Sequence, residues 1–162
     1  MEYGFMTMVP TPNIFCLVKG SGEERTLLNA FDKALLDAGI GDTNIVRMSS
    51  IVPPAARQVS SLDLPRGGLI PTAYAHIDSD MPGQIISAAI AVALPGDLSL
   101  PGVIMEHAAA QPLTNVEEKV RQMAEDAFAY RNRNLKSILS TGIEHEVKAC
   151  GAVFAGAVLW YD

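Results

Sequence analysis

The chain has 162 residues, 49% of them hydrophobic and 19% charged, so it can bury the core of one globular domain and is too apolar to be disordered. The formal net charge of −6 argues against a nucleic-acid partner, which would require a basic surface. No apolar run approaches the roughly 18 residues that cross a membrane, and the segment MEYGFMTMVP lacks the features of a signal peptide. We therefore expect one cytoplasmic domain over residues 1–162, with no membrane partner.

The first third of the chain predicts a strand, a polar hinge and a helix. Residues 13–19 are rich in β-branched and aromatic side chains and predict a strand, whereas residues 1–12 show no periodicity and are expected to form an arm. A hinge is expected at Gly20-Ser21-Gly22. Apolar side chains then recur at helical spacing before a glycine, which predicts a helix of about three turns. That stripe consists of Leu28, Phe31 and Leu35, and the glycine is Gly39.

The remainder predicts one further helix among six strands. Thr114 and Glu117 have the spacing of a capping box, and they precede an apolar stripe that ends at Tyr130. Residues 53–68 contain three prolines and two glycines, and are expected to form a loop. Two helices among runs of adjacent strands predict an α+β fold with a mostly antiparallel sheet. The predicted strands are residues 44–49, 70–80, 84–94, 102–108, 135–147 and 149–161.

Several polar groups are better explained as structural features than as sites. His76, Asp78 and Asp80 alternate along one strand and share a face, but without a fourth ligand they favour a solvated surface over a metal site. The segment Glu144-His145-Glu146 likewise predicts a polar outer surface. Cys16 and Cys150 each lie in an apolar stretch, which predicts buried, reduced thiols. No metal site is therefore expected.

The Ser49-Ser50 bond is the most unusual local feature. It ends an apolar strand and is followed by Ile51-Val52 and the pair Pro53-Pro54. A serine hydroxyl can attack the preceding carbonyl and move the acyl group from nitrogen to oxygen, provided that backbone strain and an oxyanion donor offset the lost amide resonance. Asn44 lies upstream as a candidate amide donor. Serine pairs are common, and Ser60-Ser61 is another, so the pattern alone favours an uncleaved strand end.

Six segments in a fixed order carry a more specific signal. They are LNAFDKALLDAGIG (28–41), NIVRMSSIVPP (44–54), GGLIPTAYA (67–75), PGQIISAAIAVALP (82–95), GVIMEH (102–107) and FAGAVLWY (154–161). Together they make the chain from about residue 13 to 162 resemble the archaeal pyruvoyl-dependent arginine decarboxylases. In that family the Ser-Ser bond cleaves itself, and the second serine becomes an N-terminal pyruvoyl group.

The resemblance implies that this chain cleaves itself into two chains. Ser49 would become the C-terminus of a β chain, residues 1–49, and Ser50 the cap of an α chain, residues 50–162. After the acyl shift, β-elimination releases the Ser49 carboxylate and leaves dehydroalanine, which hydrolyses to a ketone. That ketone forms a Schiff base with the substrate amine and accepts the electrons left by carbon dioxide, so that neither pyridoxal phosphate nor a metal is required.

The resemblance also implies roles for three further residues. Glu106 would protonate the carbanion, and its strand neighbours Ile104 and Ala108 are apolar, which favours a raised pKa. Asn44 matches a position linked to processing. Asp32, on the flank of the first helix stripe, matches the acid that receives the substrate guanidinium. On this interpretation, Glu106→Gln should slow turnover and spare cleavage.

The resemblance implies a self-processing enzyme that converts L-arginine to agmatine and carbon dioxide in polyamine biosynthesis. The expected assembly is a homotrimer of cleaved protomers, each an αββα sandwich with two helices outside two mostly antiparallel sheets. Ala55, Ala75-His76 and Lys33 depart from the family pattern, and Lys33 could pair with Asp37 four residues on. Two alternatives stay open: the same chemistry on another amino acid, or an unprocessed, non-catalytic paralogue subunit.

Overall fold

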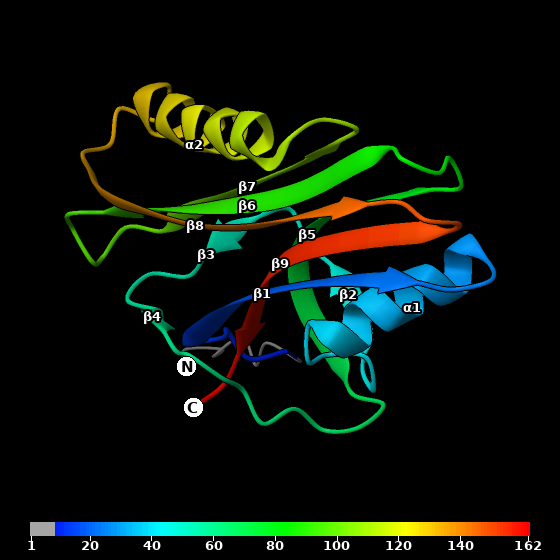
Figure 1. Cartoon of the computed structure of the whole chain (residues 1–162). Helices are drawn as coiled ribbons and strands as arrows, with labels where there is room; N and C mark the ends of the chain where they lie inside the picture. Colours follow the sequence, from blue (N-terminus) through cyan, green and yellow to red (C-terminus); the bar gives the residue numbers. More distant parts are fainter. Residues whose placement is uncertain (1–8) are drawn as a thin grey trace.

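The structure is a computed structural model that describes residues 9–162, so most of the arm expected over residues 1–12 lies outside the described part. Two sheets pack face to face, with one helix on each outer side (Figure 1). The elements are β1 (Ile14–Glu23), α1 (Leu27–Asp37), β2 (Asn44–Arg47), β3 (Ile51–Val52), β4 (Arg57–Gln58), β5 (Leu69–Ser79), β6 (Ile85–Pro95), β7 (Gly102–Ala109), α2 (Leu113–Ala129), β8 (Leu135–Glu146) and β9 (Gly151–Trp160).

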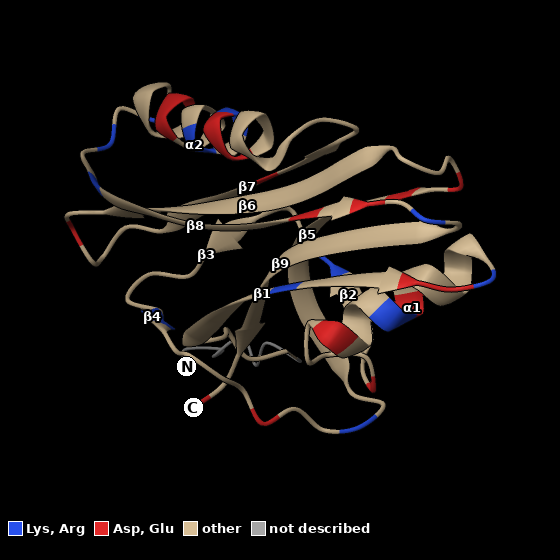
Figure 2. Cartoon of the chain, viewed as in Figure 1, with Lys and Arg blue, Asp and Glu red and all other residues tan. Residues whose placement is uncertain are grey.

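The sheets confirm the predicted α+β sandwich. One has five strands in the order β2-β5-β9-β1-β4, and the other has four in the order β3-β7-β6-β8. All pairings are antiparallel except two short parallel ones, β1 with β4 and β2 with β5. Charged residues lie mainly on the helices, in the loops and near the strand ends, whereas the centres of the sheets are almost free of them (Figure 2).

The alanine-rich strand β6 shows why small side chains recur in this sequence. Its inward side chains, such as Ile90 and Val92, join the core between the two sheets. Its outward side chains Ala89, Ala91 and Ala93 lie beneath α2. Because an alanine projects little beyond the backbone, α2 can pack close to the sheet, and β6 is buried on both faces.

The hinge expected at Gly20-Ser21-Gly22 is wrong, because β1 continues through it to Glu23. A Cβ atom on Gly20 would lie 2.2 Å from the Ala34 carbonyl oxygen, and one on Gly22 would lie 2.3 Å from the Ala30 oxygen. The glycines therefore allow α1 to pack directly against the strand backbone. Strand β1 keeps its pairing with β9 from Ile14 opposite Trp160 to Glu23 opposite Gly151.

Both helices differ in detail from their expected stripes and caps. On α1 the buried side chains are Ala30, Ala34 and Leu35, while Leu28 is 77% exposed and lies outside the packed face. Tyr130, expected as the end of the α2 stripe, is the C-cap residue just after the helix and is likewise exposed.

The capping box expected at the start of α2 is also wrong. The N-cap is Pro112, which offers no side-chain hydrogen bond, and Thr114 lies within the helix. The free Leu113 N–H instead donates to Glu144 Oε2 of β8, at 2.7 Å. A carboxylate remote in sequence thus satisfies one of the open donors of the helix N-terminus.

The polar end of β8 is tied to β1. Glu23 accepts hydrogen bonds from the Lys148 and Ala149 N–H groups, and its Oε1 lies 2.7 Å from His145 Nε2. Cys16 is buried as expected, Cys150 is partly exposed, and both are free thiols. Among residues 9–162 no group of three or more metal-ligating side chains is found, and no helix is long and apolar enough to cross a membrane.

Candidate functional site

The Ser49-Ser50 bond lies in the segment that passes from one sheet to the other. Strand β2 before it pairs with β5 of the five-stranded sheet, and β3 after it pairs with β7 of the four-stranded sheet. A cut at this bond therefore severs a connection between the two layers and leaves every ladder of each sheet intact.

Ser50 is held in an unusual backbone conformation. Its φ is +75°, in the left-handed region that non-glycine residues seldom occupy. Such a conformation costs on the order of 1–3 kcal/mol, and persists only where the surroundings enforce it. Here the carbonyl oxygen of Ser50 accepts a hydrogen bond from the Ile104 N–H at 2.9 Å, which fixes the residue to β7.

The Ser50 side chain points at Glu106. Its Oγ lies 3.2 Å from Oε1 and 3.0 Å from Oε2 of that carboxyl group. As strand alternation predicts, Glu106 shares the inward face of β7 with Ile104 and Ala108, both of which belong to or pack against the central core. Burial raises the pKa of Glu106 above its usual value, while the Ser50 hydroxyl and the Arg47 charge lower it without offsetting the rise.

Arg47 was not among the predicted site residues, but it lies at the candidate site. Its Nη2 lies 3.9 Å from Glu106 Oε1 and donates a hydrogen bond to the Tyr74 carbonyl oxygen at 3.0 Å. The guanidinium carbon lies 4.6 Å from the centre of the Tyr74 ring. The sequence shows that Arg47 is a cation on the strand just before the Ser49-Ser50 bond. Nothing in the local sequence indicates that its partner is Glu106 on β7.

Glu106 lines two cavities of about 240 Å³ each. One contains the Ser49-Ser50 bond, with apolar walls from β7 and α2 and the side chain of Arg131. The other contains Arg47, His76 and His107. The carboxyl group is thus in reach of both the Ser49-Ser50 bond and a second space large enough for part of a small molecule.

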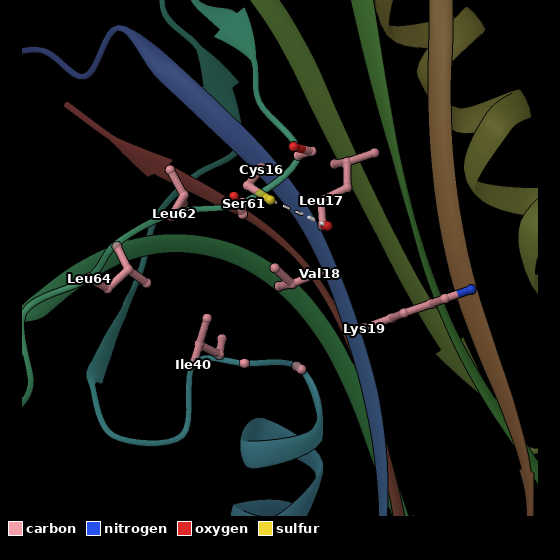
Figure 3. Close-up of a pocket in the computed structure, with 11 residues that line it drawn as sticks. Cys16, Leu17, Val18, Lys19, Ile40, Ser61, Leu62 and Leu64 are labelled. Atoms are coloured by element: carbon pink, nitrogen blue, oxygen red, sulfur yellow. Dashed lines mark hydrogen bonds between the residues drawn. The ribbon is translucent and has the colours of Figure 1, made fainter. Parts of the chain in front are cut away.

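A further cavity of about 320 Å³ lies away from this site, between β1, the end of α1 and the loop that follows β4. Figure 3 shows Val18 and Cys16 of β1 beside Ile40, Leu62 and Leu64, while Lys19 points to the opposite side of the strand. There its Nζ donates to the Gly142 carbonyl oxygen. This cavity contains neither Ser50 nor Glu106.

Two of the predicted site residues, Asn44 and Asp32, do not lie at Ser50 in this chain. The exposed Asn44 donates from Nδ2 to the Gly67 carbonyl oxygen at 2.9 Å. Asp32 is exposed on α1, which covers the far side of the five-stranded sheet (Figure 1). Within residues 9–162, no recorded hydrogen bond or ion pair joins either of them to Ser50 or Glu106.

Lys33, next to Asp32, has a different partner from the one considered above. Its Nζ lies 2.9 Å from Glu24 Oε1, whereas Asp37 accepts a hydrogen bond from the Ser21 N–H. The lysine is therefore drawn toward the start of α1 and away from Asp37. Asp32 remains an exposed carboxylate, flanked four residues either side by Leu28 and Leu36, which are 77% and 54% exposed.

Comparison with known proteins gives a consistent result over nearly the whole chain. The family profile described as pyruvoyl-dependent arginine decarboxylase matches residues 14–162. A pyruvoyl-dependent arginine decarboxylase of Methanocaldococcus jannaschii is 51% identical over 150 residues, covering 93% of this chain and 91% of that protein. Those of Methanococcus aeolicus and Pyrococcus abyssi are 45% and 40% identical, each over 93% of this chain and over 91% and 96% of their own lengths.

Proposed function

Since the chain belongs to the pyruvoyl-dependent arginine decarboxylase family, we propose that its pyruvoyl group arises from Ser50 by self-cleavage of the Ser49-Ser50 bond. The enzyme decarboxylates L-arginine, releasing agmatine and carbon dioxide. The observation that carries the cleavage proposal is the Ser50 hydroxyl against the Glu106 carboxyl, on a residue whose backbone is already left-handed.

The first step of cleavage uses groups that are already in contact. Glu106 accepts the Oγ proton, and Oγ bonds to the Ser49 carbonyl carbon. The bond from that carbon to the Ser50 nitrogen then breaks as Glu106 returns the proton to this nitrogen, which leaves an ester and a free amine. Loss of the Ser50 Cα proton then breaks the Cβ–Oγ bond and releases the Ser49 carboxylate. Water replaces the nitrogen of the resulting dehydroalanine, and ammonia leaves. Relief of backbone strain, on the order of 1–3 kcal/mol, partly offsets the lost amide resonance.

The two products should stay together because their strands are interleaved. Residues 1–49 supply β1, α1 and β2. Strand β1 lies between β9 and β4, and β2 pairs with β5, all from residues 50–162. Cleavage therefore creates two new chain ends, at residues 49 and 50, and removes no strand pairing.

When present, the pyruvoyl group supplies an electron sink for the carboxyl group that leaves. The chain's contribution to that step is a proton at Glu106. Cleavage removes the Ser50 hydroxyl, one of the groups that lower the Glu106 pKa, while burial continues to raise it. The same carboxyl group is thus suited to act as a base before cleavage and as an acid afterwards.

Substrate selection is assigned to Asp32 in a neighbouring copy of the chain. The Asp32 carboxylate is exposed on α1 between two exposed leucines, Leu28 and Leu36, which suits a surface that packs against another protomer. A homotrimer would let this carboxylate meet the substrate guanidinium near Glu106 of the adjacent copy. To assist cleavage as an amide donor, Asn44 would have to release the Gly67 carbonyl oxygen, to which its Nδ2 donates in the uncleaved chain. Free thiols at Cys16 and Cys150 support a cytoplasmic location.

Intact-mass measurement of the purified protein tests the cleavage. Chains of residues 1–49 and 50–162 are expected, the second with a keto group in place of its N-terminal amine. Carbon dioxide release from arginine, lysine, ornithine, histidine and aspartate then tests selection, and only arginine should be turned over efficiently. Asp32→Asn should raise KM for arginine. One uncleaved chain that still turns over arginine would overturn the proposal.

A further inference from the structure

We infer that Arg47 is a positioning residue that holds the Glu106 carboxyl group against Ser50 and keeps it in place across the cut. The inference rests on the self-cleavage proposed above. Arg47 Nη2 lies 3.9 Å from Glu106 Oε1, and both oxygens of the same carboxyl group face Ser50 Oγ. The Glu106 carboxyl group thus lies between the Arg47 guanidinium and the Ser50 hydroxyl and is near both.

The guanidinium of Arg47 is fixed even though its side chain is 55% exposed. Nη2 donates to the Tyr74 carbonyl oxygen at 3.0 Å, and the guanidinium carbon lies 4.6 Å above the Tyr74 ring. That ring stacks in turn on the buried Phe154, with ring centres 5.3 Å apart. A hydrogen bond and an aromatic face from one rigid residue therefore leave the cation little freedom to leave Glu106.

The pair also joins parts of the molecule that cleavage separates. Arg47 lies on β2 of the five-stranded sheet and within residues 1–49, whereas Glu106 lies on β7 of the four-stranded sheet and within residues 50–162. After the cut, no covalent bond connects the two sheets at this edge. The Arg47–Glu106 pair continues to span them, as does the Glu23–His145 pair.

The Arg47 charge also bears on both proton transfers assigned to Glu106. A neighbouring cation favours the carboxylate that cleavage requires and limits the rise in pKa caused by burial. The other groups near the carboxyl are the Ser50 hydroxyl, His76 of β5 and His107 of β7 in one cavity, and Arg131 in the other. Arg47 also lowers the pKa of His76, whose main perturbation is burial, so that His76 requires its own control.

The test compares Arg47→Gln, Arg47→Lys and the control His76→Gln in the full chain. Cleavage of the freshly synthesised chain and arginine turnover by the mature enzyme are each measured against pH. Cleavage needs the Glu106 carboxylate, so its acidic limb should move to higher pH in Arg47→Gln. Turnover needs the protonated form, so its basic limb should move the same way. Arg47→Lys should keep both limbs near their wild-type positions, and His76→Gln should move neither.

A purely structural role predicts something else. If Arg47→Gln lowers the rates and leaves both limbs in place, or if the glutamine and lysine variants shift alike, the inference is overturned. Tyr74→Leu provides a second variant that retains the charge and removes its aromatic support, and should move the limbs in the same direction by less. If Arg47→Gln fails to fold, Tyr74→Leu decides the test. Unchanged pH limbs of cleavage and turnover in Tyr74→Leu would then count against the inference. Wild-type protein that fails to cleave would overturn the proposed function itself.

Discussion

Ser50 Oγ lies 3.0 Å from Glu106 Oε2, although 56 residues separate them in the chain. The contact forms because β3, which starts just after Ser50, adds to the edge of β7, which carries Glu106. Strand pairing fixes the register, with Ile51 opposite Val103, and the Ile104 N–H holds the Ser50 carbonyl oxygen. The two side chains thus face each other in the uncleaved chain, before any substrate is present.

Replacement of Ser50 by alanine should abolish both cleavage and arginine decarboxylation, because the chain then has no hydroxyl to attack the preceding carbonyl group. Denaturing electrophoresis should show one band of 162 residues. The matched control is Ser49→Ala, in which the carbonyl group that is attacked stays in place. This variant should still be cleaved into two chains. An intact Ser49→Ala chain would show that the Ser49 hydroxyl is also required for cleavage.

Glu106→Gln should slow decarboxylation by about 10²–10⁴-fold, the usual contribution of a general acid or base. The sequence alone led us to expect that cleavage would be spared. Because both Glu106 oxygens lie within hydrogen-bonding distance of Ser50 Oγ, we now expect cleavage to slow as well. A time course of the two product bands measures it. Glu146→Gln, an exposed carboxyl on β8, serves as the control and should behave as wild type.

Gly20→Ala should destabilise the fold by about 1–3 kcal/mol or more, because the added methyl group would overlap the Ala34 carbonyl oxygen and push α1 away from β1. Urea unfolding followed by circular dichroism measures the loss. Gly96→Ala is the control, since a Cβ there meets no atom within 4 Å. Equal stability of the two variants would show that α1 does not pack as closely as described.

Glu144→Ala should cost about 0.5–2 kcal/mol of stability, the range for loss of a helix N-terminal acceptor, because the Leu113 N–H would lose its partner. Thr114→Ala should change stability by less than about 0.5 kcal/mol, as expected for a side chain that caps nothing. Urea midpoints of the two variants distinguish the observed cap from the one expected in the sequence. A larger loss of stability in Thr114→Ala than in Glu144→Ala would instead support the Thr114 capping box.

Stability should fall in acid partly through Glu23. Burial raises its pKa, but the Lys148 N–H, the His145 side chain and the Ala149 N–H lower it, and the net pKa lies below the usual value. A lowered folded-state pKa gives stability that is present above the unfolded pKa of about 4.3 and is lost as the pH drops through the folded value. Urea midpoints measured from neutral pH downward should decline less steeply in Glu23→Gln than in wild type.

Local patterns were sufficient for much of the fold. Period-3.6 apolar spacing identified both helices, and apolar runs bounded by turn residues identified the long strands. Strand alternation placed Glu106 on the same face as Ile104 and Ala108. The Ser49-Ser50 bond stood out because it ends an apolar strand and is followed closely by Pro53-Pro54. Each of these features depends on neighbours a few residues apart, which a sequence displays directly.

Other features depended on residues that meet only after folding. The extension of β1 through Gly20 reflects the approach of α1, and the cap of α2 comes from Glu144 on a later strand. Arg47 meets Glu106, which lies on the opposite sheet. A sequence shows that these side chains exist and which charges they carry. Which of them touch is set by strand order and by the packing of the two layers, because such contacts join residues whose separation along the chain has no fixed period.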